Sequence, residues 1–493
     1  MKNTFKFAAA FLLIGGTMAG CKKDYLDVTP TTAVPQEQIL GKMESITSTL
    51  SSTYRTAFNM VSTRHDSYGQ KSWDLANDLM GNDMVVHSAG YGWYNAVYNY
   101  TEWTFVTSTR QPHAAWRFYY DLIGQANTLL FGLDNLNDPS ATQADIERVR
   151  GEALGIRAFA YFYLINYFQQ TYKGNESAPG VPIYTSVALQ GNPRGTVQGV
   201  YDQIISDLET AETLLDGKGQ LDKTRMDVRV VQGFRARVAL LMEDWSTAAT
   251  YANRARQGYT PMGQTEYLEG FSKLSLSEVM WGSLIPADQA TIYASFFSHI
   301  DISTQGYAYL GGQKKITKAL YDLIPAGDVR KQVFNDPANA TATNPAYNQL
   351  KFRVPVAGSW AADYIYMRAS EMYLIEAEAL ARQGQEGPAR TVLQTMVQAR
   401  YPAYSAAGFS GQALIDEILL QRRIELWGEG FALMDIKRLM TGLNRPQGAG
   451  NHGGSNFNPS IYTTGPEDPR FIMKIPQAEL DANESMSAAD QNP

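Results

Sequence analysis

Two stretches of the chain concentrate side chains whose chemistry suits recognition of a ligand. One spans residues 66 to 109 and the other residues 291 to 312, and both are rich in aromatic residues and glycine. A flat ring held by loop backbone can stack on the apolar face of a sugar, while Asn and Asp bond the sugar hydroxyls. Ordinary packing of the same rings is the alternative. The candidate ligand-binding residues are Tyr91, Trp93 and Tyr94 from the first stretch and Tyr307 and Tyr309 from the second.

Residues 412 to 440 place charged side chains on an apolar helical stripe. The spacing predicts two helices that meet at Gly428-Glu429-Gly430, where glycine permits a sharp turn. Arg422 falls on the apolar face of the first helix, and a buried cation is costly unless a carboxylate pairs with it. We interpret this group as a structural ion-pair network whose loss at Arg422 costs about 3 to 5 kcal/mol. Its members are Arg422, Glu425, Glu429 and Asp435.

The sequence contains no motif for metal, phosphate or nucleophilic chemistry. The five histidines are scattered without the spacing of zinc ligands, so neither a metal site nor a cofactor is expected. No nucleophile elbow, P-loop or dinucleotide fingerprint is present. Acidic pairs such as Asp78 with Asp83 or Glu376 with Glu378 are more often ion-paired than catalytic in a helix-rich chain. We therefore do not expect an enzyme.

Composition narrows the class of protein. The 493 residues are 44% hydrophobic and 12% aromatic, which is typical of a globular chain. The formal net charge is −7, with no basic cluster, and this opposes a nucleic-acid partner. Cys21 is the single cysteine, so no internal disulfide can form.

The N-terminus predicts export and lipid anchoring. Residues 1–20 have a basic start, an apolar run and small residues at the end, which is the pattern of a signal peptide. Met18-Ala19-Gly20-Cys21 fits a lipobox, so Cys21 is the predicted lipid attachment point. Residues 21–35 then form a lipidated N-terminus and a polar tether. Secretion with a free cysteine is the alternative.

The rest of the chain, residues 36–493, predicts a single all-α domain with sequence halves of about 36–215 and 260–493. Helical periodicity favours about four tetratricopeptide-like pairs, with long loops and little β structure. Small residues between the members of a pair let the two backbones approach closely. The predicted pairs are 146–170 with 197–215, 227–242 with 246–256, 363–382 with 387–400, and the two helices of 412–440.

Several motifs together resemble the SusD/RagB family of outer-membrane nutrient-binding lipoproteins. QRRIELWGEGFALMDIKRL, from residue 421, is similar to the family signature ERR-x-EL-x-x-EG-x-x-x-x-D-x-x-R. It departs from that signature at Gln421, where Glu is usual, and at Ala432, where Arg is common. The start CKKDYLD, the run EALGIRAFAYFYLINYF from residue 152 and the C-terminal IMKIPQAELDANESMSAADQNP also resemble the family.

The resemblance implies a cell-surface protein of the outer membrane that binds a nutrient, most often an oligosaccharide. It also implies a protein partner, a TonB-dependent SusC-like transporter, to which the ligand is delivered. In the family the ligand face uses loops of the first half plus an insertion in the second, where the two aromatic stretches fall. The alternatives are a peptide-binding relative, a glycoside hydrolase on a helical scaffold with two carboxylates about 5 to 9.5 Å apart, and a protein-binding adaptor.

Overall fold

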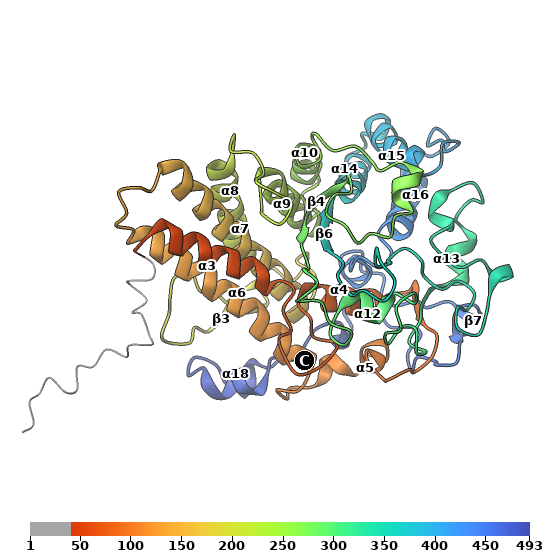
Figure 1. Cartoon of the computed structure of the whole chain (residues 1–493), viewed down its shortest axis with the longest axis horizontal. Coiled ribbons are helices and arrows are strands. Elements are labelled where there is room, and N and C mark those ends of the chain that lie inside the picture. Colours follow the sequence, from red (N-terminus) through yellow and green to blue (C-terminus); the bar gives the residue numbers. More distant parts are fainter. Residues whose placement is uncertain (1–40) are drawn as a thin grey trace, which may run out of the picture.

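The computed structural model describes residues 41–493, and helices dominate it (Figure 1). In Figure 1 the long helices fill the left and upper parts of the molecule, whereas the lower right consists of loops and short elements. The predicted all-α fold class with little β structure is confirmed. The predicted signal peptide (residues 1–20), Cys21 and the tether to residue 35 lie outside the described residues.

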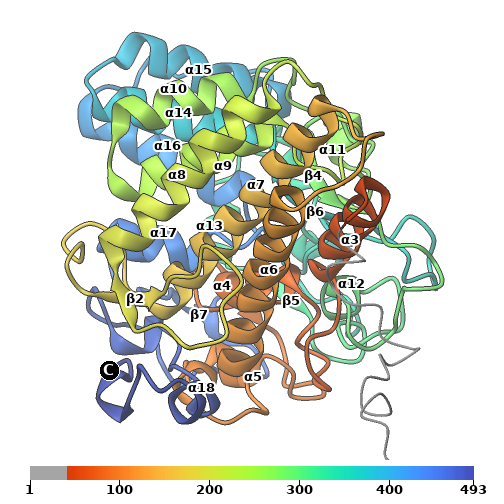
Figure 2. The ribbon, with the colours of Figure 1, turned by 90° about the vertical axis from the view of Figure 1, so that its left-hand side faces the viewer.

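The long helices pack one against the next in the order in which they follow along the chain (Figure 2). This arrangement confirms the tetratricopeptide-like architecture, because each helix buries one face on its predecessor and another on its successor. The helices are α6 (Gln111–Asp134), α7 (Gln143–Phe168), α8 (Val197–Leu215), α9 (Val228–Met242), α10 (Trp245–Ala255), α14 (Ala369–Arg382), α15 (Glu386–Arg400) and α16 (Gly411–Glu425).

Side-chain caps set where four of these helices begin. Each capping oxygen accepts a hydrogen bond from a backbone N–H of the first turn, which otherwise has no partner within the helix. The caps are Thr142 before α7, Thr196 before α8, Asp227 before α9 and Asp244 before α10. Such caps explain why the observed starts lie within a few residues of those predicted from periodicity.

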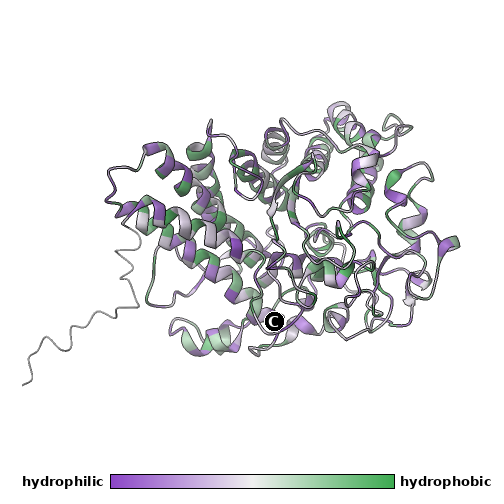
Figure 3. Ribbon diagram, in the orientation of Figure 1, coloured by the Kyte–Doolittle hydropathy of each residue, from purple (hydrophilic) through white to green (hydrophobic). Residues whose placement is uncertain are grey.

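Helix α7 is buried along most of its length, as its apolar sequence predicts. Its two central charges are paired: Glu152 binds Arg225 at 2.6 Å, and Arg157 binds Asp207 at 2.6 Å. Helices α9 and α10 pack on each other, and small residues such as Ala239 and Ala248 are fully buried in them. Figure 3 shows apolar and polar residues interleaved along the helices, as expected where only one face is buried.

Two predicted helical segments differ from the structure. Residues 364–368 form strand β6 (Tyr364–Arg368), which pairs antiparallel with β4 (Val279–Ser283), so α14 begins later than predicted. The segment 412–440 does give two helices, α16 and α17 (Ala432–Arg438), but they do not stack as a repeat pair. Helix α17 is two turns long and packs on α4 (Gln70–Leu79), whereas α16 packs on α14 and α15.

The remaining strands form two-stranded sheets. The pairs are β1 (Met84–Val86) with β5 (Lys314–Ile316), β2 (Pro179–Pro182) with β3 (Arg194–Thr196), and β7 (Gln447–Ala449) with β8 (His452–Gly454). The remaining α-helices are α3 (Met43–Thr56), α5 (Asn95–Tyr98), α11 (Gln264–Tyr267), α12 (Phe296–Ile300), α13 (Lys318–Asp322) and α18 (Gln477–Ala482). From residue 41 to 493, none of the helices combines the length and the apolar character needed to cross a bilayer.

Candidate functional site

A short antiparallel sheet brings the two aromatic stretches together. Strand β1 lies within the first stretch, after α4, and strand β5 directly follows the second stretch. The two strands pair antiparallel, with Val86 opposite Lys314. The pairing continues past the strands, because the N–H of His87 donates to the Gln313 carbonyl at 2.9 Å. The loops that leave this sheet, residues 88–94 and 307–312, therefore lie side by side.

Rings from both stretches form one cluster with His65. We call this cluster the aromatic ridge, and its members are His65, Tyr91, Trp93, Tyr293 and Tyr307. The His65 ring lies at its centre, with ring centroids 4.9 Å from Trp93, 5.2 Å from Tyr293 and 5.7 Å from Tyr307. The hydroxyl of Tyr307 also forms a hydrogen bond with Nδ1 of His65. Tyr91 meets Tyr307 edge-on at 5.1 Å.

Buried groups beneath the ridge hold Tyr307 in place. The His299 ring stacks on Tyr307 with centroids 5.1 Å apart, and its Nε2–H donates to the backbone carbonyl of His65 at 2.8 Å. Burial lowers the pKa of His299 to about 3, so this imidazole is neutral at physiological pH. A neutral, hydrogen-bonded ring stacked under Tyr307 is a rigid support for this partly exposed ring.

The predicted site residues fall into three groups. Tyr91, Trp93 and Tyr307 belong to the ridge, and Tyr91 is 64% exposed. Tyr94 was expected on an exposed loop, but it is 1% exposed, and its hydroxyl donates to Tyr68 at 2.7 Å. A ring buried in this way cannot stack on a ligand, so Tyr94 supports the ridge from below. Tyr309 is partly exposed and makes no ring contact with the others within residues 41–493.

The sequence analysis did not predict two residues of the ridge, Tyr293 and His65, or the neighbouring Trp360. Tyr293 lies within the second stretch and is 56% exposed, so its loop context was the available signal. His65 stands outside both aromatic-rich runs, and only the fold shows that its ring contacts rings of both. Trp360 packs over Gly306, where a Cβ would lie 2.6 Å from the indole, which explains the need for glycine there.

A cavity opens on each side of the ridge. One, of about 200 Å³, is lined by Tyr91, Trp93, Arg64 and Arg110. The other, of about 370 Å³, is lined by His65, Tyr293, Trp360 and Ser295 among others. The carboxylates that line the smaller cavity with Trp93 are those of Asp66 and Glu102, and both are buried in ion pairs with arginine.

A cavity larger than these two, of about 520 Å³, lies away from the ridge, between α16, α17 and residues 78–84. Both arginines of its lining are in ion pairs, Arg423 with Asp83 at 2.7 Å and Arg422 with Asp435 at 2.8 Å. Size alone therefore favours this cavity, whereas the exposed rings favour the ridge. We assign the ridge as the candidate site because its apolar groups remain open to a ligand.

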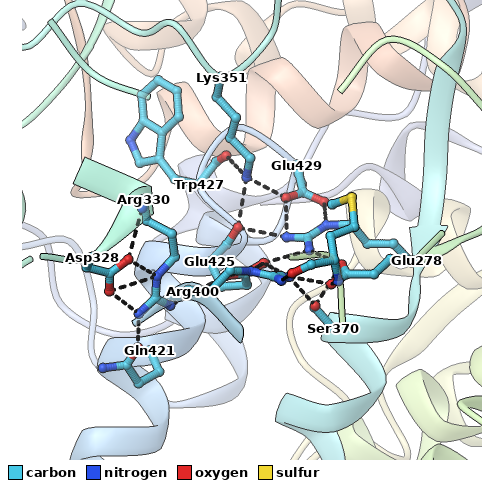
Figure 4. Close-up of polar contacts among 12 residues, drawn as sticks. Glu278, Asp328, Arg330, Lys351, Ser370, Arg400, Gln421, Glu425, Trp427 and Glu429 are labelled. Carbon is cyan, nitrogen blue, oxygen red and sulfur yellow. Dashed lines mark hydrogen bonds and ion pairs between the residues drawn. The ribbon is translucent and has the colours of Figure 1, made fainter. Parts of the chain in front are cut away.

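A large buried ion-pair network includes Arg400 of α15 and Glu425 of α16 (Figure 4). Arg368 is at its centre and contacts Glu425 at 2.7 Å, Glu429 at 2.7 Å and Glu278 at 2.9 Å. Four acidic and four basic side chains take part, so the network is balanced in charge. They are Glu278, Asp328, Glu425 and Glu429, with Arg330, Lys351, Arg368 and Arg400.

The network strongly favours the charged forms of Glu425 and Glu429. Burial alone raises the pKa of Glu429, but Arg368 and Lys351 outweigh it and lower that pKa to about 2. Burial also acts on Glu425, and the guanidiniums of Arg400, Arg368 and Arg330 hold its pKa well below the usual range. Both groups are therefore fixed as anions across the physiological range and are suited to structure rather than to proton transfer.

Arg422 belongs to a second, separate network. Its Nε binds Asp435 at 2.8 Å, and Asp435 also binds Arg438 at 2.7 Å. Arg438 on α17 also forms an ion pair with Glu378 on α14 at 2.7 Å, so this network connects α17 to the long helices. Of the three carboxylates expected to pair with Arg422, only Asp435 does so. Glu425 and Glu429 instead pair with Arg368 in the first network.

Comparison with known proteins places these features in a family. Residues 24–240 match a family model described as SusD-like, starch-binding associating with outer membrane. Residues 336–493 match the model of the SusD family, SusD_RagB. The chain is a member of the SusD/RagB family. The prediction from the sequence motifs is thereby confirmed.

Solved SusD/RagB structures share the fold over nearly the whole chain. A SusD-like carbohydrate binding protein from Bacteroides vulgatus is 28% identical with a TM-score of 0.80, covering 92% of this chain and 98% of that one. A SusD superfamily protein from Bacteroides fragilis (23% identical, TM-score 0.74, 91% and 99% covered) shows the same fold. So does surface glycan-binding protein A from Bacteroides thetaiotaomicron (18%, TM-score 0.70, 92% and 99%). No curated protein sequence matches significantly.

The SusD/RagB signature of residues 421–438 supplies much of both ion-pair networks. Gln421, which stands where the family usually has Glu, accepts a hydrogen bond from Arg330 at 2.6 Å. An amide accepts this bond without adding a charge, which suits a network that is already balanced. In this SusD/RagB chain the signature therefore builds the scaffold, while the ridge lies on loops outside it.

Proposed function

We propose that this chain is a cell-surface outer-membrane lipoprotein that binds an oligosaccharide and delivers it to a TonB-dependent, SusC-like transporter. The observation that carries the proposal is the aromatic ridge, in which exposed rings from two distant loops are held on a rigid base. Pyranose rings present apolar C–H faces, so stacking on Tyr91, Trp93 or Tyr293 excludes water at little entropic cost.

Similarity to solved relatives supports the same ligand class. The Bacteroides vulgatus protein is described as carbohydrate binding, and it shares 28% of its residues with this chain over nearly its full length. One family model is described as associating with the outer membrane, which supports the location. The lipid anchor at Cys21 and the transporter partner rest on the sequence motifs and the family resemblance.

Carboxylates near the ridge favour binding over hydrolysis. A glycosidase needs a carboxyl group free to donate a proton or to attack the sugar. Asp66 accepts two hydrogen bonds from Arg64, at 2.8 and 2.6 Å, and Glu102 accepts from Arg110 and from the Gln111 N–H. Because these hydrogen bonds occupy both carboxylates, Asp66 and Glu102 are suited to holding the arginines in place rather than to attacking a sugar.

The test is ligand titration of ridge variants. We expect Trp93→Ala and Tyr307→Ala each to weaken glycan binding by about 2 kcal/mol, as at the centre of other binding sites. Phe131→Ala is the matched control, because this exposed ring on α6 lies outside the ridge. Circular dichroism verifies folding, and the panel includes peptides. Unchanged affinity of both ridge variants for every ligand of the wild type would place the site elsewhere, and release of reducing ends would identify a hydrolase.

The transporter partnership has its own test. Gentle detergent extraction of cells that carry a tagged form of this chain should recover a much larger membrane protein with it. Recovery of the lipoprotein alone at several detergent strengths would contradict the partnership without bearing on glycan binding.

A further inference from the structure

The smaller cavity beside the ridge has an unusual arrangement of charge. Two arginines, Arg64 and Arg110, and two carboxylates, Asp66 and Glu102, line it together with Trp93. The two carboxylate side chains are 0% exposed, whereas Arg64 is 21% and Arg110 is 34% exposed. The acids therefore lie behind the guanidiniums, and a molecule that enters the cavity meets the basic groups first.

The buried acids have little capacity left for a ligand. Both oxygens of Asp66 are engaged by Arg64, through Nε at 2.8 Å and Nη2 at 2.6 Å. Glu102 accepts from Arg110 Nη1 at 3.1 Å and from the backbone N–H of Gln111 at 3.0 Å. These bonds fix the orientation of both guanidiniums without exposing negative charge to the cavity.

Donors on the arginines remain open. Between residues 41 and 493, the only side-chain hydrogen bond of Arg110 is the one from Nη1 to Glu102, which leaves the other edge of the guanidinium unpaired. Nη1 of Arg64 makes a single long contact, 3.4 Å to the Thr109 carbonyl. Planar N–H pairs of this kind match the two oxygens of a carboxylate better than a single hydroxyl.

The cavity is continuous with the stacking surface. The guanidinium carbon of Arg64 lies 5.8 Å from the centroid of the Trp93 ring. Arg110 lies over Phe105 at 4.2 Å, which holds it at the rim of the same cavity. A sugar in contact with Trp93 therefore lies next to the Arg64 guanidinium, and Arg110 lines the same cavity.

We propose that this cavity is a subsite for the carboxylate of a uronic acid unit, and that the ligand of this protein is an acidic glycan. The inference rests on the proposed function, since it needs a sugar stacked on Trp93. Trp93 supplies the stacking face, and Arg64 and Arg110 supply the donors that distinguish an acidic from a neutral sugar. Because each arginine charge is balanced by a buried acid, the preference comes from short-range hydrogen bonds rather than from long-range attraction.

The experiment compares matched ligands on the full mature protein. Oligomers of galacturonan, alginate and glucuronoxylan are each titrated beside the carboxyl-reduced form of the same oligomer, which is neutral. For at least one backbone we expect the acidic form to bind tenfold or more tightly than its reduced partner. A sulfated neutral glycan distinguishes a carboxylate subsite from one for sulfate.

Variants separate the subsite from the ridge. Arg110→Gln should remove the preference for the acidic form while binding of the reduced form stays within about twofold. Arg117→Gln, an exposed arginine on α6 outside the cavity, should leave the preference unchanged. Trp93→Ala should weaken acidic and reduced forms alike. Arg64→Gln, a second variant, should act as Arg110→Gln does.

The outcomes are distinguishable. Equal affinity for acidic and reduced forms of every backbone, retention of the preference in both Arg110→Gln and Arg64→Gln, or binding of the sulfated glycan alone would overturn the uronate subsite. In those cases weakened binding by Trp93→Ala still supports glycan capture on the ridge. Failure of Trp93→Ala and Tyr307→Ala to weaken any ligand would instead overturn the proposed function.

Discussion

Gly90 lies so close to Gly312 that a Cβ on Gly90 would stand 3.1 Å from the Gly312 backbone nitrogen and 3.3 Å from its Cα. The first glycine belongs to the loop of Tyr91 and Trp93, and the second to the loop of Tyr307. Contact between the two backbones thus fixes how the two halves of the aromatic ridge face each other.

We expect Gly90→Ala to weaken glycan binding about fivefold, because a Cβ at φ +50° is strained and also separates the two loops. Gly174→Ala is the control, since Gly174 has φ +86° with nothing within 4 Å of the added carbon. Both variants should lose similar stability in urea unfolding, and only Gly90→Ala should lose affinity. Equal affinity losses in the two variants would contradict this account of the contact.

Arg368 and Arg422 should differ sharply in their contribution to stability. Removing Arg368 leaves four buried carboxylates with three cations, so Arg368→Met should lower the free energy of unfolding by about 3–5 kcal/mol. Arg422→Met leaves Asp435 paired with Arg438, so its cost should be only about 1.5–3 kcal/mol. Chemical denaturation measures both.

The sequence alone predicts the higher cost for Arg422, and the second ion pair of Asp435 is the physical reason for the revision. Equal losses in the two variants would show that Arg438 does not compensate for Arg422. An unchanged melting temperature with lost ligand affinity in either variant would contradict a structural role.

The pH dependence of stability should show the effect of Glu429. Its pKa is about 2 in the folded protein against 4.5 for an ordinary glutamate, so the unfolded chain binds the proton more tightly. The stabilisation is therefore complete above about pH 4.5 and is lost as the pH falls towards 2, with a total of about 3 kcal/mol. Urea unfolding between pH 2.5 and 7 should give a shallower acid loss for Glu429→Gln than for the wild type. Parallel profiles would contradict the assignment.

Lipid attachment is tested at Cys21. Cys21→Ser should move the protein from the membrane to the soluble fraction, because the lipid would have no attachment point. Fractionation of cells that express each form measures this, with Trp93→Ala as a control that retains the anchor. Equal membrane retention of the Ser form would contradict lipidation.

The sequence predicts an element correctly where the residues that determine it lie within that element. The prediction fails where those residues lie elsewhere in the chain. Helices such as α8 and α9 follow from apolar periodicity and a capping Thr or Asp, and both signals lie within the element. Residues 364–368 continue the apolar pattern of α14, and only pairing with β4 makes them a strand. Tyr94 has the same loop context as Tyr91, yet its burial depends on Tyr68 and on the carbonyl of Ser72.

The same distinction applies to the ion pairs. An arginine on an apolar stripe predicts a carboxylate partner, but not which one, because the partner is chosen by the fold. Glu425 binds Arg330 and Arg368, which lie 95 and 57 positions away in the chain. No spacing rule connects such residues, so the sequence could name the charged residues but not divide them into two networks.

The pairing of β1 with β5 also has a consequence for when the protein becomes able to bind. His65 and Tyr307 are 242 positions apart, so the ridge is a contact of high sequence separation and forms only after a long loop has closed. An N-terminal fragment holds Tyr91 and Trp93 but not Tyr293 or Tyr307. A chain whose residues 293 to 307 have not yet folded back onto residues 65 to 93 lacks the complete ridge, so ligand binding begins only after this contact has formed.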